Sequence, residues 1–169
     1  QAAAEMQSPL GKSFAAYLQG AQAFYDGDFD AASKQFEALT SVDQPWLGET
    51  ARYMLGRVAV NRAQVGLCDE YGNMAKNAGT EATGAAEAAL NAYLQAYPQG
   101  MYAVSARGLL RRVYWLGGRA DQLAAAYATI LPEKPAARGV EDVAYADEID
   151  NKLLASAMSS DALARDPIL

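Results

Sequence analysis

Three amphipathic helices in close succession constrain the fold of this chain more than any other feature of its sequence. In residues 85–131, apolar residues recur at the i, i+3, i+4 and i+7 spacing that marks one face of a helix. The stripes comprise Leu90, Tyr93, Leu94 and Tyr97, then Ala106, Leu109, Leu110 and Val113, and then Leu123, Ala126, Tyr127, Ile130 and Leu131. Short turns at Pro98–Gly100 and Gly117–Gly118 separate them. Because these connections are so short, neighbouring helices must run antiparallel and bury their stripes against each other.

Composition favours helix throughout and excludes several classes of function. The 169 residues suit one domain with a continuous core, and 51% of them are hydrophobic, with alanine abundant. The net charge of −6 argues against nucleic-acid binding as the main activity. No stretch reaches the roughly 18–20 apolar residues of a transmembrane helix. With no histidine and a single cysteine, the chain lacks the usual general base, the commonest metal ligand and any internal disulfide. We therefore expect no catalytic residues, no metal site and no cofactor.

Helical signals also cover the rest of the sequence. A stripe of Phe14, Tyr17, Leu18, Ala21 and Tyr25 precedes a turn at Gly27, and Asp28 is expected to cap the next helix. The expected organisation is an irregular segment over residues 1–12, three helical hairpins over 13–131 and an insertion at about 66–79. A proline- and alanine-rich linker over 135–139 leads to a C-terminal helix over 138–158 and a tail over 159–169. Since the chain begins at Gln1, we expect a processed protein or an excised domain.

Glycines in the middle of three expected helices indicate where helices approach closely. Gly20, Gly56 and Gly108 each stand in the first helix of a hairpin. A glycine at such a position costs about 1 kcal/mol relative to alanine, so it needs a packing reason. The natural reason is close approach of a neighbouring helix. The spacing of Gly20 and Gly56 is close to the tetratricopeptide period of about 34 residues, and the longer spacing to Gly108 accommodates the insertion.

The same residues resemble the tetratricopeptide repeat family. Leu55-Gly56 is similar to the family's Leu-Gly pair, and residues 27–32 resemble its turn between helices. Phe36 falls where the second helix carries an aromatic residue, and Pro98 where a repeat ends. The resemblance implies a right-handed superhelical stack of antiparallel helical hairpins, a TPR-like α-solenoid. Residues 93–102 also resemble the degenerate repeats of bacterial envelope proteins, including outer-membrane assembly lipoproteins.

An arginine-rich stretch stands out in this acidic chain. Arg107, Arg111, Arg112 and Arg119 lie between Glu87 and Asp121 with no acidic residue among them. One hypothesis is a guanidinium patch for carboxylates, phosphates or a peptide C-terminus, which the forked arginine side chain suits. The alternative is a solvated helix face, or internal pairing with the acidic run over residues 141–150. We expect internal pairing for Arg107 and an open position for Arg112.

The repeat register places several residues in a concave groove where a partner could bind. The candidates are Tyr53, Arg57, Tyr102, Arg111 and Arg112. Tyrosine and arginine are the residue types that most often dominate interface energetics. The resemblance implies a non-catalytic scaffold for a protein or peptide partner, periplasmic or outer-membrane-associated, with a cytoplasmic location as the alternative. A second copy of the chain would also suit such a surface. The alternative function is an α-superhelical, non-catalytic region of a larger cell-wall lytic enzyme.

Overall fold

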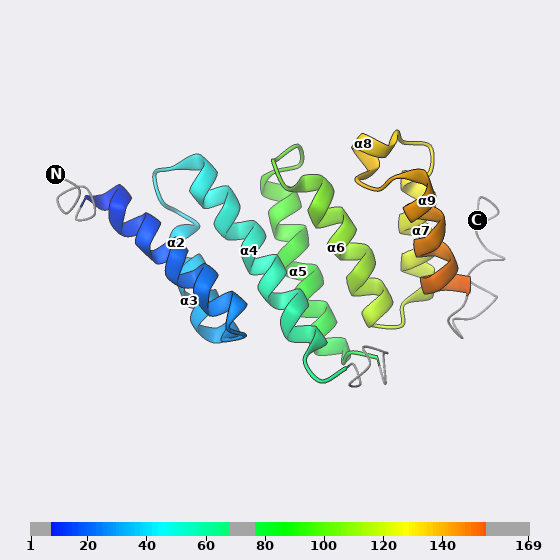
Figure 1. The fold of residues 1–169 in the computed structure, drawn as a ribbon, viewed down its shortest axis with the longest axis horizontal. Coiled ribbons are helices and arrows are strands. Elements are labelled where there is room, and N and C mark those ends of the chain that lie inside the picture. Colours follow the sequence, from blue (N-terminus) through cyan, green and yellow to red (C-terminus); the bar gives the residue numbers. More distant parts are fainter. Residues whose placement is uncertain (1–7, 68–76, 155–169) are drawn as a thin grey trace.

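The described part of the chain is helical from end to end (Figure 1). The computed structural model describes residues 8–67 and 77–154. The elements are α2 (Pro9–Tyr25), α3 (Phe29–Leu39), α4 (Pro45–Gln64), α5 (Thr80–Ala96), α6 (Ala103–Leu116), α7 (Ala120–Ile130), α8 (Pro135–Arg138), α9 (Asp142–Ile149) and the π-helical turn η1 (Asp150–Leu154). Within these two ranges no strand occurs, so the prediction of an all-α fold is confirmed.

From α2 to α7 each helix packs against the next, and the helices follow one another along the long axis of the molecule while running across it (Figure 1). The turns expected near Gly27 and Gly117 are present. Gly27 and Gly118 adopt φ angles of 79° and 65°, a left-handed conformation that glycine accepts without strain. Asp28 caps α3 as expected, because its carboxylate accepts a hydrogen bond from the backbone N–H of Ala31 at 3.0 Å.

Two of the three mid-helix glycines mark close helix approaches. A Cβ atom added to Gly20 would lie 3.0 Å from Gln35 Cβ and from Phe36 Cε1 of α3. A Cβ atom at Gly56 would lie 2.7 Å from Leu90 Cδ2 of α5. The prediction is wrong for Gly108, where the nearest atom is Nη2 of Arg111, at 3.8 Å on the same helix. Close helix packing therefore does not explain Gly108. Gly20 lets α3 pack closely against α2, and Gly56 lets α5 pack closely against α4.

The apolar core follows the line of helices. Around α4, α5 and α6 it includes Val60, Ala86, Leu90, Tyr93, Ala106, Val113 and Leu116. Toward the N-terminal end it includes Phe24, Ala32, Phe36, Leu39, Leu47, Ala51, Met54 and Val58. Toward the C-terminal end it includes Leu123, Ala124, Tyr127, Ile130, Tyr145 and Leu153. The first group joins α4, α5 and α6, the second joins α2, α3 and α4, and the third joins α7 to α9 and η1, with Tyr114 and Trp115 of α6 packed against it.

The stripe expected for the first helix is only partly buried: Tyr17 packs against the core beside Phe36 and Ala21 is half-buried, but the other three residues are exposed. Leu18 and Tyr25 are 58% and 75% exposed, and Phe14 is also exposed. The buried residues of α2 are Gly20 and Phe24. The reason is that α3 packs against the face of α2 that carries Gly20 and Phe24, so Leu18 and Tyr25 point away from α3.

Three boundaries differ from the expectation. The first helix begins at Pro9 rather than after residue 12, because Ser8 Oγ accepts from Gly11 N at 3.0 Å and a proline is well suited to the first helical position. Residues 135–138 form the short helix α8, closed by Gly139 at φ 76°, where a linker was expected. The expected C-terminal helix is present as α9 and η1 up to Leu154. Residues 68–76 of the insertion and the tail over 159–169 lie outside the described residues.

Candidate partner-binding surface

The structure brings two of the five candidate residues together. The rings of Tyr53 in α4 and Tyr102 just before α6 stack with centroids 4.4 Å apart and an interplanar angle of 5°. Tyr93 of α5 meets the ring of Tyr53 edge-on at 5.7 Å. Thr50 Oγ1 and the Tyr102 hydroxyl lie 3.1 Å apart. Both candidate rings are half-buried, so they join α4 to α6 and leave only part of their surface for a partner.

Glu49 fixes this aromatic cluster to the turn between α5 and α6. Its Oε1 accepts hydrogen bonds from the Tyr93 hydroxyl at 2.8 Å and from Met101 N at 2.6 Å. The same hydroxyl accepts from Tyr102 N at 2.9 Å. Burial and the adjacent carboxylate of Glu49 raise the pKa of Tyr93 above its usual value. The hydroxyl therefore stays protonated and acts as a structural donor.

Arg57 does not join this cluster. Its guanidinium lies over the ring of Phe24 in α2, 4.8 Å from the centroid. Its Nη1 also lies 3.7 Å from the sulfur of Met54. The contact with Phe24 joins α4 to α2, so Arg57 stabilises the packing of the N-terminal helices instead of standing beside Tyr53 and Tyr102.

Arg111 is buried, which corrects its expected place on an open binding surface. It is 5% exposed, its Nε lies 3.4 Å from Glu148 Oε2, and its guanidinium lies over the ring of Tyr127. The expected folding back of the acidic run therefore occurs, but onto Arg111. Glu148 also accepts from the Tyr127 hydroxyl at 2.9 Å and lies 3.4 Å from Lys152 Nζ. Burial acts to raise the pKa of Glu148, but Lys152, Tyr127 and Arg111 together hold it below its ordinary value.

Arg112 and Arg107 form hydrogen bonds with neutral oxygens instead of ion pairs. Arg112 is exposed, as expected, and its Nη2 donates to Gln64 Oε1 at 2.6 Å, which connects α6 to the end of α4. Arg107 was expected to pair with the acidic run, and that expectation is wrong. Its Nη2 donates to the backbone carbonyl of Pro98 at 3.0 Å. Within the described residues no carboxylate forms an ion pair with Arg107.

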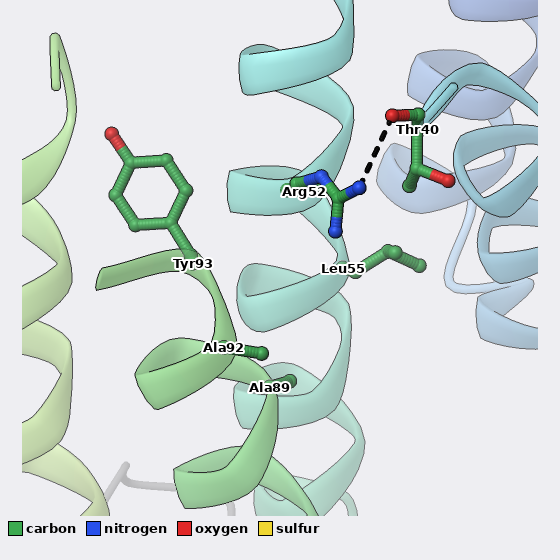
Figure 2. Close-up of a pocket in the computed structure, with 6 residues that line it drawn as sticks. All are labelled: Thr40, Arg52, Leu55, Ala89, Ala92 and Tyr93. Atoms are coloured by element: carbon green, nitrogen blue, oxygen red, sulfur yellow. Dashed lines mark hydrogen bonds between the residues drawn. The ribbon is translucent and has the colours of Figure 1, made fainter. Parts of the chain in front are cut away.

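A groove between α4 and α5 was not expected from the sequence (Figure 2). Arg52 and Leu55 come from α4, Ala89, Ala92 and Tyr93 from α5, and Thr40 from the end of α3. The Arg52 guanidinium stands beside the groove and donates to the backbone carbonyl of Thr40 at 3.4 Å. The spacing in the sequence is consistent with this groove. Arg52 and Leu55 are three residues apart on α4, as are Ala89 and Ala92 on α5, so each pair shares one helix face.

A second pocket, of about 160 Å³, lies between α6 and α7. Its lining comprises the apolar Leu110, Ala126 and Ile130, the hydroxyl-bearing Tyr114 and Thr129, and the arginines Arg107 and Arg111. The spacing of the two arginines predicted that they project together, and both line this pocket. The sequence did not indicate the apolar wall from α7.

In the ranges 8–67 and 77–154, no group of three or more His, Cys, Asp or Glu side chains is placed to hold a metal ion. No helix of these ranges combines the length and the apolar character needed to cross a membrane. Comparison with protein-family models, with curated proteins and with solved structures gives no match to the chain. The likeness to tetratricopeptide repeats therefore depends on the chain's own residues.

Proposed function

We propose that this chain is a non-catalytic scaffold that binds a peptide or a partner domain in grooves between the helices of its stacked helical hairpins. In the proposed architecture, α2–α3, α4–α5 and α6–α7 are three successive TPR-like hairpins of a right-handed α-solenoid. The close approaches at Gly20 and Gly56 support this register, since each glycine lies against the second helix of its own hairpin. Such stacks serve binding because each hairpin adds a similar groove beside the last.

The groove of Figure 2 is the observation that carries the proposal. Ala89 and Ala92 leave an apolar floor with no side chain beyond Cβ, and Arg52 stands at its edge with donors beyond the one used by Thr40. An apolar hollow with a few convergent polar groups is typical of a ligand-binding site. Arginine at such an edge is also among the residue types that contribute most to binding energy.

We also propose a role in bacterial cell-envelope assembly, in the periplasm or at the outer membrane. The support is the resemblance of residues 93–102 to the degenerate repeats of envelope proteins. This stretch contains Tyr93, Pro98 and Tyr102, which form the α5–α6 corner and its aromatic cluster.

Capture of binding partners from bacterial envelope extract tests the proposal. The bait proteins are the wild type and Ala92→Trp, which fills the groove from an exposed position. Ala85→Trp is the matched control, since Ala85 is exposed on the same helix outside the groove. We expect proteins captured by the wild type and by the control to be lost with Ala92→Trp.

Two results would contradict the proposal. If no protein is retained by the wild type above the background of an unrelated bait, the scaffold function is wrong. If the captured proteins bind Ala92→Trp as well as Ala85→Trp, the groove is not where they bind.

A further inference from the structure

The pocket between α6 and α7 combines a cationic end with an apolar wall. Arg107, Leu110 and Arg111 line it from α6, with the two arginines one helical turn apart, and the apolar Ala126 and Ile130 line it from α7. The volume of about 160 Å³ suits a single side chain and not a large cofactor. The shape and chemistry therefore suit a short group that carries a negative charge next to an aliphatic one.

The positive charge of this pocket exceeds the negative charge that faces it. Glu148 is the carboxylate paired with Arg111, and the 3.4 Å separation is long for a charge-assisted hydrogen bond. The same oxygen is shared with the Tyr127 hydroxyl and with Lys152. Arg107 adds a second guanidinium, whose partner is the neutral carbonyl of Pro98. Among the described residues, Glu148 is therefore the carboxylate that pairs with these two arginines, since Glu87, which accepts from Tyr114, pairs with Arg119.

The burial of Arg111 makes this excess charge effective. The Arg111 side chain is 6% exposed, so solvent screens its positive charge only weakly. Its counter-charge, Glu148, comes from α9. Arg107 lies at the exposed edge and can use its remaining N–H groups on an incoming carboxylate, since a guanidinium has five. The other polar groups of the lining are already used as donors, because the Tyr114 hydroxyl donates to Glu87 Oε1 at 3.3 Å and the Thr129 hydroxyl donates to the Ala125 carbonyl at 2.8 Å.

We propose that this pocket binds an acidic side chain of a partner peptide, with an aliphatic residue beside it packed on Leu110, Ala126 and Ile130. This inference rests on the proposed scaffold function and names the chemistry of its partner. Arg107 makes the contact that a ligand can reach first, and Arg111 supplies the buried positive charge behind it. The carboxylate of the peptide supplies the negative charge that Arg107 does not receive from its Pro98 partner.

The test is a titration of the ¹⁵N-labelled protein followed by amide chemical shifts. The probe is a peptide with one Glu-Leu pair in a Gly-Ser background, acetylated and amidated so that no terminal charge competes. The matched probes carry Gln-Leu or Glu-Ser. We expect saturable shifts at Leu110, Ala126 and Thr129 with Glu-Leu, and binding about fivefold weaker with either matched probe, the change expected for loss of one partly exposed contact.

Protein variants and a second ligand complete the design. Arg107→Gln should weaken binding of the Glu-Leu peptide about fivefold, while Arg62→Gln should not, because Arg62 is an exposed arginine paired with Asp30 elsewhere. Shifts that persist unchanged in Arg107→Gln would overturn the inference. Equal shifts with free glutamate would also overturn it, since the aliphatic contact would then be irrelevant.

A random peptide library panned on the wild-type protein separates failure of this inference from failure of the scaffold function. Enrichment of acidic-aliphatic peptides supports the inference. Enriched peptides that lack acidic residues and bind Arg107→Gln normally would refute the pocket assignment and leave the scaffold function standing. If no peptide is enriched and no shift is seen with any probe, both are wrong.

Discussion

Replacement of Gly56 is the sharpest probe of how the helices pack. In the structure, a Cβ atom at this position would lie 2.7 Å from Leu90 Cδ2 and 3.3 Å from Leu90 Cγ. Leu90 is completely buried, so its side chain has little freedom to move away. Gly84 is the matched control, because it also lies within a helix and nothing stands within 4 Å of its added Cβ atom.

The expected free-energy changes differ at the two glycines. Gly84→Ala should stabilise the chain by about 1 kcal/mol, the difference in helix propensity. Gly56→Ala gains the same propensity but overpacks Leu90, which costs about 1–3 kcal/mol, so the net change is zero to a destabilisation of about 2 kcal/mol. Gly56→Leu places three further carbons in the same space and should cost about 3 kcal/mol.

Urea unfolding followed by circular dichroism measures these differences. For a chain of this length, 1 kcal/mol moves the melting temperature by about 2–4 °C, so thermal melts provide a second measurement. A double-mutant cycle identifies the contact. Leu90→Ala alone should cost about 2–5 kcal/mol, and combined with Gly56→Ala it should cost less than the sum, because the new methyl group enters the space that the leucine leaves.

The reasoning would be refuted by equal stabilisation from Gly56→Ala and Gly84→Ala. It would also be refuted by strict additivity of Gly56→Ala and Leu90→Ala. Either result would mean that α4 and α5 do not meet at Gly56, and the hairpin register that supports the proposed function would lose its main contact.

Three further changes test other parts of the structure. Tyr145→Phe should destabilise by about 1–3 kcal/mol in urea unfolding, because the buried Tyr127 carbonyl loses a donor at 2.6 Å, whereas Tyr25→Phe at an exposed ring should be neutral. The folded-state pKa of Glu148 lies below its ordinary value of 4.5, so this group stabilises the fold above that value and the contribution is lost as the pH falls through the lowered pKa. The stability advantage over Glu148→Gln should therefore shrink on acidification, and a pH-independent difference would contradict this assignment. Arg112→Glu should reduce partner capture with a melting temperature nearly unchanged, and unchanged capture would remove Arg112 from the binding surface.

Short-range sequence signals predicted most of the fold. The apolar stripes of α5, α6 and α7, the turn at Gly27 and the cap at Asp28 follow from spacing and turn chemistry, which act within a few residues. Close packing at Gly20 and Gly56 was also predictable, since a glycine in a helix interior needs a reason. Gly108 shows the limit of that argument, because a glycine can stand in a helix without a near neighbour.

The candidate site was harder to predict because it depends on contacts between distant segments. Arg107 and Arg111 share a helix face, yet one is held by a backbone carbonyl and the other is buried under α9. Nothing local in the sequence distinguishes them, since the difference comes from where Glu148 arrives. The orientation of α2 failed for the same reason. The apolar spacing predicts Leu18 and Tyr25 on the buried face, whereas the contact with α3 buries Gly20 and Phe24.

The most direct test of the scaffold function is an amide-shift footprint on the ¹⁵N-labelled protein, using a peptide selected from the random library. We expect the largest shifts at Arg52, Leu55, Ala89 and Ala92 of the groove in Figure 2. Shifts confined to the exposed outer face of α2, or the absence of any saturable shift, would contradict the scaffold function.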